Sequence, residues 1–477
     1  MKLSQLVEKI QILSDYEDIE ITALTDDSRK ITSGCVFFCI SGAGFDGHSA
    51  ALAAVEAGAA AVVCQRDTGA PNQLLVNNSR EAYALACAAY FGNPAEKLKM
   101  IGITGTNGKT TTTFILKNIL ESTGKKTGLI GTVKNMVGAK EYPATLTTPD
   151  PYELHGLLHK MADEGCEYCV MEVSSQALDQ NRTAGILFNA AMFTNLSVDH
   201  LDYHKDFEHY AQAKRMLFDN AAMAIVNLDD EAAALMTDGV KCPVFSYSVN
   251  TDSSDYTAKN IRLKAGGAEY ELVGEGVISR VYFGVPGTFS VYNSMGAAVC
   301  ALKLGIPMAQ IVNALKVFPG VPGRLEVVPT ATDYTVIIDY ADTPAGPENI
   351  LGALREVTEG RIITVFGCGG DRDKTKRPKM GEIAGKMSDV VVVTSDNPRT
   401  EEPSAIIEDI LAGMKNIKTP MIVNENRTEA IAEALKTARK DDVVVLAGKG
   451  HETYQILKTG KIHYDEREVV ANILEGK

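Results

Sequence analysis

The chain has 477 residues, of which 45% are hydrophobic and 23% charged, and its net charge at pH 7 is −14. Such a length is too great for one hydrophobic core and predicts about three domains. An acidic balance of this size argues against a general nucleic-acid or membrane-surface binder.

The N-terminal block is predicted to run to about residue 96. Residues 1–12 carry no basic-then-apolar signal and predict an amphipathic helix. Strands are predicted at 36–40 and 59–64. The glycines at 42, 44 and 47 fit the dinucleotide-binding pattern G-x-G-x-x-G, with Asp67 at about the required distance. Because a lone match of this kind is common by chance, a dinucleotide-dependent oxidoreductase is kept only as an alternative.

A phosphate-binding loop is predicted where an apolar strand at 98–103 leads into a helix at 111–120. The glycines between them let consecutive backbone N–H groups turn toward phosphate oxygens. Lys109 adds a charge for the outer phosphates, and the hydroxyl of a threonine after it suits Mg²⁺. Ile103 stands where the general pattern G-x-x-x-x-G-K-[ST] has its first glycine. The stretch predicts a nucleoside triphosphate site, against the alternative of a ligand-free turn.

The nine cysteines are odd in number and scattered along the chain. Cys166 and Cys169 form a lone C-x-x-C with no second pair and no histidine nearby. This pattern predicts buried free thiols rather than a zinc or redox site, and it fits a reducing cytoplasm.

Two acidic motifs follow strands of the same predicted domain. Glu172 lies in the strand at 169–173, and a carboxylate there can hold Mg²⁺ opposite the loop hydroxyl. Asp199 and His200 follow the strand at 190–195, so both motifs are expected at one edge of the sheet. For His200, a metal or phosphate role and an ordinary surface histidine remain equally open.

Lys214 lies in a predicted helix at 207–218, where a lysine is ordinarily a solvated charge. A strand at 224–227 and an irregular β-rich portion at 243–287 complete the second block. Residues 318–324, rich in proline and glycine, predict a linker to the third block.

Four polar loops mark the third block, each after a predicted strand. Open α/β sheets bind ligands at the carboxyl ends of their strands, so we expect these loops at one edge. Their mixture of arginine with acidic residues favours a zwitterionic ligand. The predicted strands are 335–339, 362–367, 390–394 and 443–447.

Taken together, these motifs resemble those of the Mur ligases, which build the peptide of the bacterial cell wall. The resemblance spans essentially the whole chain and is closest to the branch that adds the third amino acid. Eight motifs carry it in order: residues 104–111, 147–150, 171–175, 199–200, 289–293, 323–326, 396–399 and 448–452.

The resemblance implies an α/β fold of three domains. A small α/β domain at 1–96 would bind the UDP-linked substrate. A central domain at 97–322 would bind ATP on a mostly parallel, P-loop NTPase-like sheet. A Rossmann-like domain at 323–477 would bind the amino acid.

The family's nucleotide and metal roles carry over to the matching residues. ATP is expected at Gly105, Thr106, Asn107, Gly108, Lys109, Thr110, Thr111, Asn293, Arg324 and Asp339. Mg²⁺ is expected at Thr110, Glu172 and His200. Lys214 matches a lysine that is carbamylated in the family, as N6-carboxylysine, and supports a metal ion there. The candidate catalytic residues are therefore Lys109, Glu172, His200 and Lys214.

The substrate roles carry over in the same way. UDP-MurNAc-L-Ala-D-Glu is expected at Ser28, Arg29, Gly42, Gly44, Thr147, Thr148, Ser174, Gln180 and Arg182. The glycine loop at 42–47 is thereby assigned to the UDP end of this substrate instead of a dinucleotide. The second substrate, meso-diaminopimelate, is expected at Arg372, Asp396, Asn397, Pro398, Arg399, Gly448 and Glu452. Diaminopimelate is lysine with one more carboxylate, and the planar fork of Arg399 suits that group. Lysine-adding members generally lack this arginine.

These roles imply an ATP-dependent ligase that activates the D-Glu side-chain carboxylate as an acyl phosphate and joins it to diaminopimelate. A cytoplasmic monomer without nucleic-acid or membrane partners is expected. A lysine-adding member, a folylpolyglutamate synthetase-like ligase and a nucleotide-regulated binding module remain alternatives. Asp342 and Ala345 depart from the family pattern, which has a histidine and an acidic residue there. A carboxylate beside ATP phosphates would need a neighbouring cation.

Overall fold

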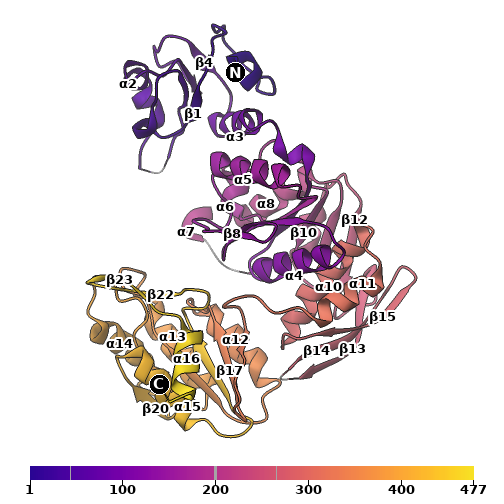
Figure 1. The fold of residues 1–477 in the computed structure, drawn as a ribbon, viewed down its shortest axis with the longest axis vertical. Helices are drawn as coiled ribbons and strands as arrows, with labels where there is room; N and C mark the ends of the chain where they lie inside the picture. Colours follow the sequence, from indigo (N-terminus) through magenta and orange to yellow (C-terminus); the bar gives the residue numbers. More distant parts are fainter. Residues whose placement is uncertain (43, 198–200, 265, 477) are drawn as a thin grey trace. The chain divides into compact units, whose positions relative to one another are not determined.

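The structure is a computed structural model that describes residues 1–42, 44–197, 201–264 and 266–476. It divides into two compact units, one of residues 1–257 with 295–311 and one of residues 258–294 with 312–477. Both units are built from helices packed on mostly parallel sheets, as the sequence predicts (Figure 1). The domain boundaries at 96 and 322 stay predictions.

The first unit opens with a parallel four-stranded sheet. Its strands lie in chain order: β1 (Ala23–Thr25), β2 (Cys35–Phe38), β3 (Ala61–Cys64) and β4 (Gln73–Leu75). The short helix α2 (Ala51–Glu56) leads into β3, and the longer α3 (Ser79–Tyr90) follows β4. Asn78 caps the N-terminus of α3, and its side chain accepts hydrogen bonds from two backbone N–H groups of the first turn.

The helix predicted over residues 1–12 is wrong, because α1 covers only Leu3–Leu6. Beyond it, the N–H of Leu13 donates to the carbonyl of Leu75 in β4 at 2.8 Å. Leu3 and Leu6 are buried in the core of the sheet. These two apolar residues are therefore buried by a single turn of helix.

An 11-stranded sheet has the strand order β15-β14-β13-β12-β11-β10-β5-β9-β6-β7-β8. From β12 to β6 the neighbours run parallel, and the hairpins at the two edges are antiparallel. The strands are β5 (Lys99–Thr104), β6 (Thr127–Ile130), β7 (Asn135–Val137), β8 (Lys140–Tyr142), β9 (Tyr168–Glu172), β10 (Ala190–Phe193), β11 (Ala224–Asn227), β12 (Val244–Ser248), β13 (Tyr256–Lys264), β14 (Gly267–Gly274) and β15 (Val277–Phe283).

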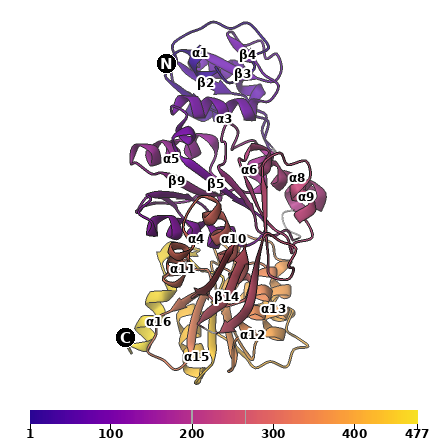
Figure 2. The same cartoon turned by 90° about the vertical axis from the view of Figure 1, so that its right-hand side faces the viewer.

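Helices cover both faces of the parallel strands. Figures 1 and 2 show α4 (Lys109–Ser122) on one face and α5 (Pro151–Asp163) on the other. The apolar side of α5 packs with β9 and β10 into one core, and each fully buried leucine or methionine there contributes about 1.5–3 kcal/mol. The remaining helices are α6 (Ser175–Asp179), α7 (Leu201–His204), α8 (Phe207–Arg215), α9 (Ala233–Thr237), α10 (Thr288–Lys303) and α11 (Met308–Lys316).

The second unit carries a six-stranded sheet in the order β16-β17-β21-β18-β19-β20, parallel except for β16. Its strands are β16 (Glu326–Val328), β17 (Thr335–Asp339), β18 (Ile362–Phe366), β19 (Val390–Val393), β20 (Met421–Val423) and β21 (Val443–Ala447). A hairpin, β22 (Tyr454–Leu457) with β23 (Gly460–His463), follows.

Helices α15 (Arg427–Thr437) and α16 (Glu466–Leu474) bury their apolar sides in the core on one face of this sheet. The unit also contains α12 (Ala345–Arg355), α13 (Lys376–Met387) and α14 (Pro403–Ala412). The strands β17, β18, β19 and β21 are neighbours in the sheet and run parallel, so the loops that follow them lie at one edge.

All nine cysteines are free thiols, and eight of them are buried. Burial raises the pKa of the Cys166 and Cys169 thiols, in keeping with the inert thiols expected from the lone C-x-x-C. Cys242 is the exception in being only half-buried.

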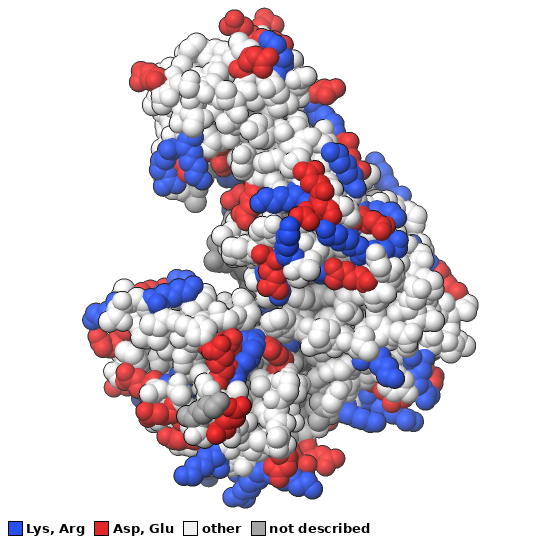
Figure 3. All heavy atoms as spheres, in the orientation of Figure 1, with Lys and Arg blue, Asp and Glu red and all other residues white. Residues whose placement is uncertain are grey.

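Charged side chains of both signs are mixed on the surface. On the face that Figure 3 shows, Lys and Arg alternate with Asp and Glu. Ion pairs join Lys126 and Lys140 to Glu164, at 3.2 and 2.5 Å. Among the described residues, no helix is long and apolar enough to cross a membrane.

Candidate active site

The predicted phosphate loop lies between β5 and α4, and neighbouring strand ends fix its backbone. The N–H of Thr106 donates to the carbonyl of Asn195 at 2.8 Å, and the N–H of Asn107 donates to the Asn195 side chain at 2.9 Å. Thr194 closes the loop by donating its hydroxyl to the carbonyl of Asn107. Asn195, at the end of β10, is a positioning residue for the loop that the sequence did not single out.

Gly105 has no room for a side chain. An added Cβ would lie 2.0 Å from the Thr194 hydroxyl, and its φ of +144° is rarely adopted by other residues. Gly108 has a φ of +84° directly before α4. The two glycines therefore let the loop turn tightly against β10 at the helix N-terminus, the arrangement that binds phosphate groups.

Lys109 folds back onto its own loop. Its Nζ donates to the carbonyls of Gly105 and Thr106, each at 2.9 Å. Lys214, which is 2% exposed, donates its Nζ to the same Gly105 carbonyl at 2.8 Å and lies over the ring of Tyr210. The structure thus brings both predicted lysines to one carbonyl of the phosphate loop.

Thr110 and Glu172, the two predicted Mg²⁺ ligands of this unit that the structure describes, are buried and lie side by side. The Thr110 hydroxyl donates to Oε2 of Glu172 at 3.0 Å. The N–H of Thr132 donates to Oε1 at 2.9 Å and its hydroxyl donates to Oε2 at 3.1 Å. A Cβ on Gly131 would lie 2.3 Å from Oε1, so this carboxylate needs a glycine beside it. A carboxylate and a hydroxyl fit the oxygen preference of Mg²⁺.

The residues expected to hold the sugar and peptide of the UDP substrate cluster nearby in the same unit. Thr148 donates its hydroxyl to the carbonyl of Glu172 at 2.8 Å and accepts from the N–H of Ser174 at 3.0 Å. Arg182 donates to the carbonyl of Thr148 at 2.8 Å and to the side chain of Gln180 at 2.8 Å. Thr147 meets this cluster by a hydroxyl–hydroxyl contact of 3.0 Å with Thr132.

The residues expected to meet the UDP end lie in turns after β1 and β2. Ser28 and Arg29 sit in a single helical turn capped by Asp27. The Arg29 guanidinium lowers the pKa of Asp27 to about 2 through a hydrogen bond of 2.9 Å. Gly42 donates its N–H to the carbonyl of Phe45 at 2.8 Å, and an added Cβ on Gly44 would meet nothing within 4 Å.

The dinucleotide alternative is not supported by this loop. Asp67 is bonded within its own turn, accepting from the N–H of Gly69 at 2.8 Å and from Gln73. The glycine loop opens onto a short 3₁₀ turn and the six-residue α2, instead of the longer helix that cradles a pyrophosphate.

In the second unit, Asp339 ends β17 and is 5% exposed. Burial raises the pKa of its carboxyl to about 6, although the Arg324 guanidinium acts in the opposite direction. The N–H of Leu325 donates to its Oδ2 at 2.7 Å. Arg324 also lies over the ring of Tyr340, which contacts the imidazole of His451. Asn293, the third predicted nucleotide contact of this unit, is a buried residue of α10.

Asp342, which departs from the family pattern, does have a neighbouring cation. Lys376 donates its Nζ to the backbone carbonyl of Asp342 at 2.7 Å. Burial raises the pKa of the Asp342 carboxyl, while the charges of Lys376 and Arg324 lower it. The cation that a carboxylate at this position would need beside ATP is therefore present in the same unit, as Lys376.

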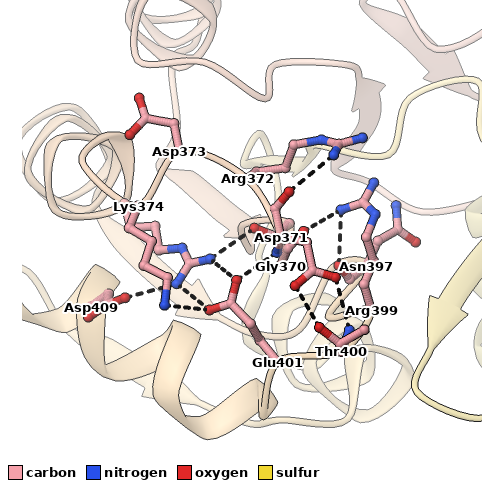
Figure 4. Close-up of polar contacts among 12 residues, drawn as sticks. Gly370, Asp371, Arg372, Asp373, Lys374, Asn397, Arg399, Thr400, Glu401 and Asp409 are labelled. Carbon is pink, nitrogen blue, oxygen red and sulfur yellow. Dashed lines mark hydrogen bonds and ion pairs between the residues drawn. The ribbon is translucent and has the colours of Figure 1, made fainter. Parts of the chain in front are cut away.

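The predicted diaminopimelate residues gather at the shared edge of β18, β19 and β21. Arg399 donates through NH1 to the carbonyl of Gly370 at 2.7 Å. A Cβ placed on Gly369 would lie 2.9 Å from NH1 of Arg399 and 3.7 Å from Cγ of Arg372. Figure 4 shows both guanidinium groups on the same side of the two loops. The side chains of two arginines therefore lie beside one glycine, and their planar guanidinium groups are of the kind that binds carboxylates.

A second part of this site joins the β19 and β21 loops. Asn397 donates its amide to Oε2 of Glu452 at 2.8 Å, and Lys449 donates to the Asn397 oxygen at 3.1 Å. A Cβ on Gly448 would lie 2.9 Å from Oδ2 of Asp396, a buried oxygen that has no hydrogen-bond partner among the described residues. Lys449, fully buried, is a member of this group that the sequence did not single out.

Two buried arginines support the same loops and were also missed. Arg377 is 1% exposed and binds Glu401, and Arg427 is 2% exposed and binds Glu466. Arg427 also donates to the carbonyls of Ser395 and Ala447, at the ends of two site strands. His200, predicted to bind metal, lies outside the described residues.

Comparisons with known proteins agree with this fold. A Mur ligase middle-domain model matches residues 103–301, a Mur ligase glutamate-ligase-domain model matches 323–450 and a Mur ligase catalytic-domain model matches 20–90. The chain therefore belongs to the Mur ligase family. The α/β fold class and three-domain Mur ligase architecture expected from the sequence are confirmed.

Within that family, the similarity extends over full-length relatives of one name. The UDP-N-acetylmuramoyl-L-alanyl-D-glutamate--2,6-diaminopimelate ligase of Clostridium perfringens is 46% identical, covering 98% of each chain. The ligase of the same name from Clostridium tetani is 44% identical, covering 100% of this chain and 99% of its own. A solved structure of such a ligase is 30% identical, covers 100% of this chain and 99% of its own, and has a TM-score of 0.75.

Proposed function

We propose that this chain is an ATP-dependent ligase that joins meso-diaminopimelate to UDP-MurNAc-L-Ala-D-Glu in the synthesis of peptidoglycan precursors. The observation that carries the proposal is that the side chains of two arginines, Arg372 and Arg399, both lie beside Gly369. Diaminopimelate has two carboxylates, and each needs a cation in the site. Lysine has one carboxylate and needs only one such cation. The full-length similarity to diaminopimelate ligases supports the same acceptor.

The first half of the reaction activates a carboxylate. The γ-phosphate of ATP passes to the side-chain carboxylate of D-Glu, which gives an acyl phosphate and ADP. Lys109 already lies within the phosphate loop, and its charge would stabilise the negative charge on the transferred group. Thr110 and Glu172 would hold Mg²⁺, which when bound neutralises phosphate charge.

Lys214 is proposed to act beside the same loop. It is buried and bonded to the Gly105 carbonyl, so its amine lies next to the phosphate site. The family's carbamylated lysine supports the same assignment, because a carbamate would replace the cation by an oxygen ligand for a metal ion.

The second half of the reaction forms the amide bond. The neutral amine of diaminopimelate attacks the acyl carbon, and the C–O bond to phosphate breaks. Arg372 and Arg399 would hold the two carboxylates, while Glu452 would hold the ammonium that does not react. Exclusion of water from the acyl phosphate protects it from hydrolysis.

The proposal is tested by incubating the purified protein with ATP, Mg²⁺ and UDP-MurNAc-L-Ala-D-Glu, adding either diaminopimelate or lysine. Amide product and ADP are expected with diaminopimelate in equal amounts, and far less product with lysine. Equal or better use of lysine would overturn the choice of amino acid. Product formed only from a folate substrate and glutamate would favour the folylpolyglutamate alternative, and slow ATP turnover that no amino acid stimulates would favour a nucleotide-regulated binding module.

A further inference from the structure

The two loops that carry Arg372 and Arg399 are joined backbone to backbone. The N–H of Gly370 donates to the carbonyl of Asn397 at 2.9 Å. A Cβ on Gly370 would lie 1.9 Å from the carbonyl oxygen of Pro398, so that only glycine allows this approach. The position of one arginine is therefore mechanically linked to the position of the other.

Asp371, directly before Arg372, has a φ of +54°, a conformation that a non-glycine residue keeps only when its surroundings hold it there. Its N–H donates to Oε1 of Glu401 at 2.6 Å. Its carboxylate accepts from the hydroxyl of Thr400 at 2.7 Å and from the N–H of Thr400 at 3.2 Å. Each of these contacts comes from the loop that carries Arg399 (Figure 4).

Arg377 anchors this arrangement from the first turn of α13. Its guanidinium binds both oxygens of Glu401, at 2.8 and 3.0 Å, and also donates to the carbonyl of Gly369 at 3.2 Å. A further bond of 2.9 Å runs to Asp409. The Arg377 guanidinium lowers the pKa of Glu401 to about 2, so the pair stays charged at neutral pH.

We propose that Asp371, Arg377, Thr400 and Glu401 form a positioning unit that fixes the spacing of the Arg372 and Arg399 guanidinium groups. Because that spacing must match the two carboxylates of one amino acid, the unit sets the preference for diaminopimelate over lysine. This inference rests on the proposed function. The four residues are positioning residues, because they act on the acceptor only through the two arginines.

The sharpest test uses the exposed Thr400. Thr400→Val keeps the size of the side chain and removes the hydroxyl that binds Asp371, whereas Thr400→Ser keeps the hydroxyl. The KM for diaminopimelate is expected to rise several-fold in the valine variant, with unchanged KM values for ATP and the UDP substrate. The serine variant should retain the wild-type values. Equal KM values for diaminopimelate in both variants would overturn the role of Thr400.

Glu401→Gln tests the buried pair, with Lys374→Ala as its matched control. Lys374 also contacts Glu401, at 3.1 Å, but it is 67% exposed, and such exposed ion pairs contribute little. The glutamine variant is expected to raise the KM for diaminopimelate by about tenfold and to reduce the preference over lysine, since the charged bond to the buried Arg377 is lost. The alanine control should leave both unchanged. A parallel rise in all three KM values would show a general structural defect and overturn the proposal.

Hydrogen exchange separates this inference from the proposed function. The Asp371 amide should exchange faster in Glu401→Gln than in the wild type, because it loses its carboxylate acceptor. If the wild type uses lysine instead, the proposed function fails together with the role of the unit in selecting diaminopimelate, and a KM increase confined to lysine would support only the positioning of the two arginines. Unchanged exchange at Asp371, together with unchanged acceptor KM values, would overturn the unit whichever amino acid is used.

Discussion

The charged side chains of both candidate sites are held by protein partners within the fold. Lys109 and Lys214 share the carbonyl of Gly105, and Arg399 is fixed by the carbonyl of Gly370. A side chain held in this way loses less freedom when the ligand arrives, so more of the binding energy is retained. Single substitutions should therefore change one substrate's KM without changing the others.

Replacing Arg399 by lysine keeps the charge but removes the planar fork. We expect the KM for diaminopimelate to rise by about tenfold or more, because a bidentate bond to a carboxylate is lost. Initial rates at saturating ATP measure the effect, and Arg399→Ala should cost still more. An unchanged KM for diaminopimelate in the alanine variant would contradict the assigned role.

Asp339 predicts a pH dependence of stability. Its pKa is raised from 3.8 to about 6 by burial, so the folded protein binds this proton more tightly than the unfolded chain does. The stabilisation is complete below pH 4 and is lost as the pH rises through about 6, to the extent of roughly 2–3 kcal/mol. Asp339→Asn imitates the protonated form and keeps an oxygen for the N–H of Leu325.

The asparagine variant should therefore gain stability over the wild type as the pH rises from 5 to 7.5. Denaturant unfolding at the two pH values measures this difference directly. If the stability difference between the asparagine variant and the wild type is the same at both pH values, Asp339 is not the titrating group.

Among the helices and strands, three strands made of apolar runs have the bounds that the sequence predicts. The strands β11, β17 and β21 have the predicted bounds, because runs of valine, isoleucine and leucine buried on both sides have few other arrangements. Helix α4 is longer than predicted at both ends, starting directly after Gly108. Helix α8 is shorter, because a 3₁₀ turn replaces it after Arg215.

Within each unit, several of the predicted site residues lie in loops that follow parallel strands, since parallel strands order their loops along one edge. What the sequence could not supply is the set of buried partners. Arg377 pairs with Glu401 and Arg427 with Glu466, and each pair joins residues that are far apart in the chain. A local sequence pattern does not indicate which arginine will pair with a carboxylate from a distant helix or loop.

The contact of the phosphate loop with β10 gives a test at Gly105. In Gly105→Ala the new methyl group would lie 2.0 Å from the Thr194 hydroxyl, and the φ of +144° would be strained. We expect nucleotide affinity to fall by at least about tenfold as the loop shifts. Calorimetric titration with a non-hydrolysable ATP analogue measures it. Gly284→Ala is the control, because a Cβ there would meet nothing within 4 Å; equal affinity in the two variants would contradict the prediction.

For the molecule as a whole, the division into two compact units predicts more than one step of unfolding. Calorimetry without ligands should resolve at least two transitions. A non-hydrolysable ATP analogue with Mg²⁺ should raise the temperature of at least one of them, since ligands stabilise the state that binds them. A single transition with equal calorimetric and van't Hoff enthalpies would contradict this expectation.

The distribution of thiols has a practical consequence for such measurements. The chain contains no tryptophan, so intrinsic fluorescence reports little on its conformation. Cys242, half-buried among eight buried cysteines, offers a natural attachment point for one dye without prior mutagenesis. Because burial raises the pKa of its thiol, labelling should be faster at pH 8.5 than at neutral pH. The native sequence thus already contains a site for attaching a fluorescent dye.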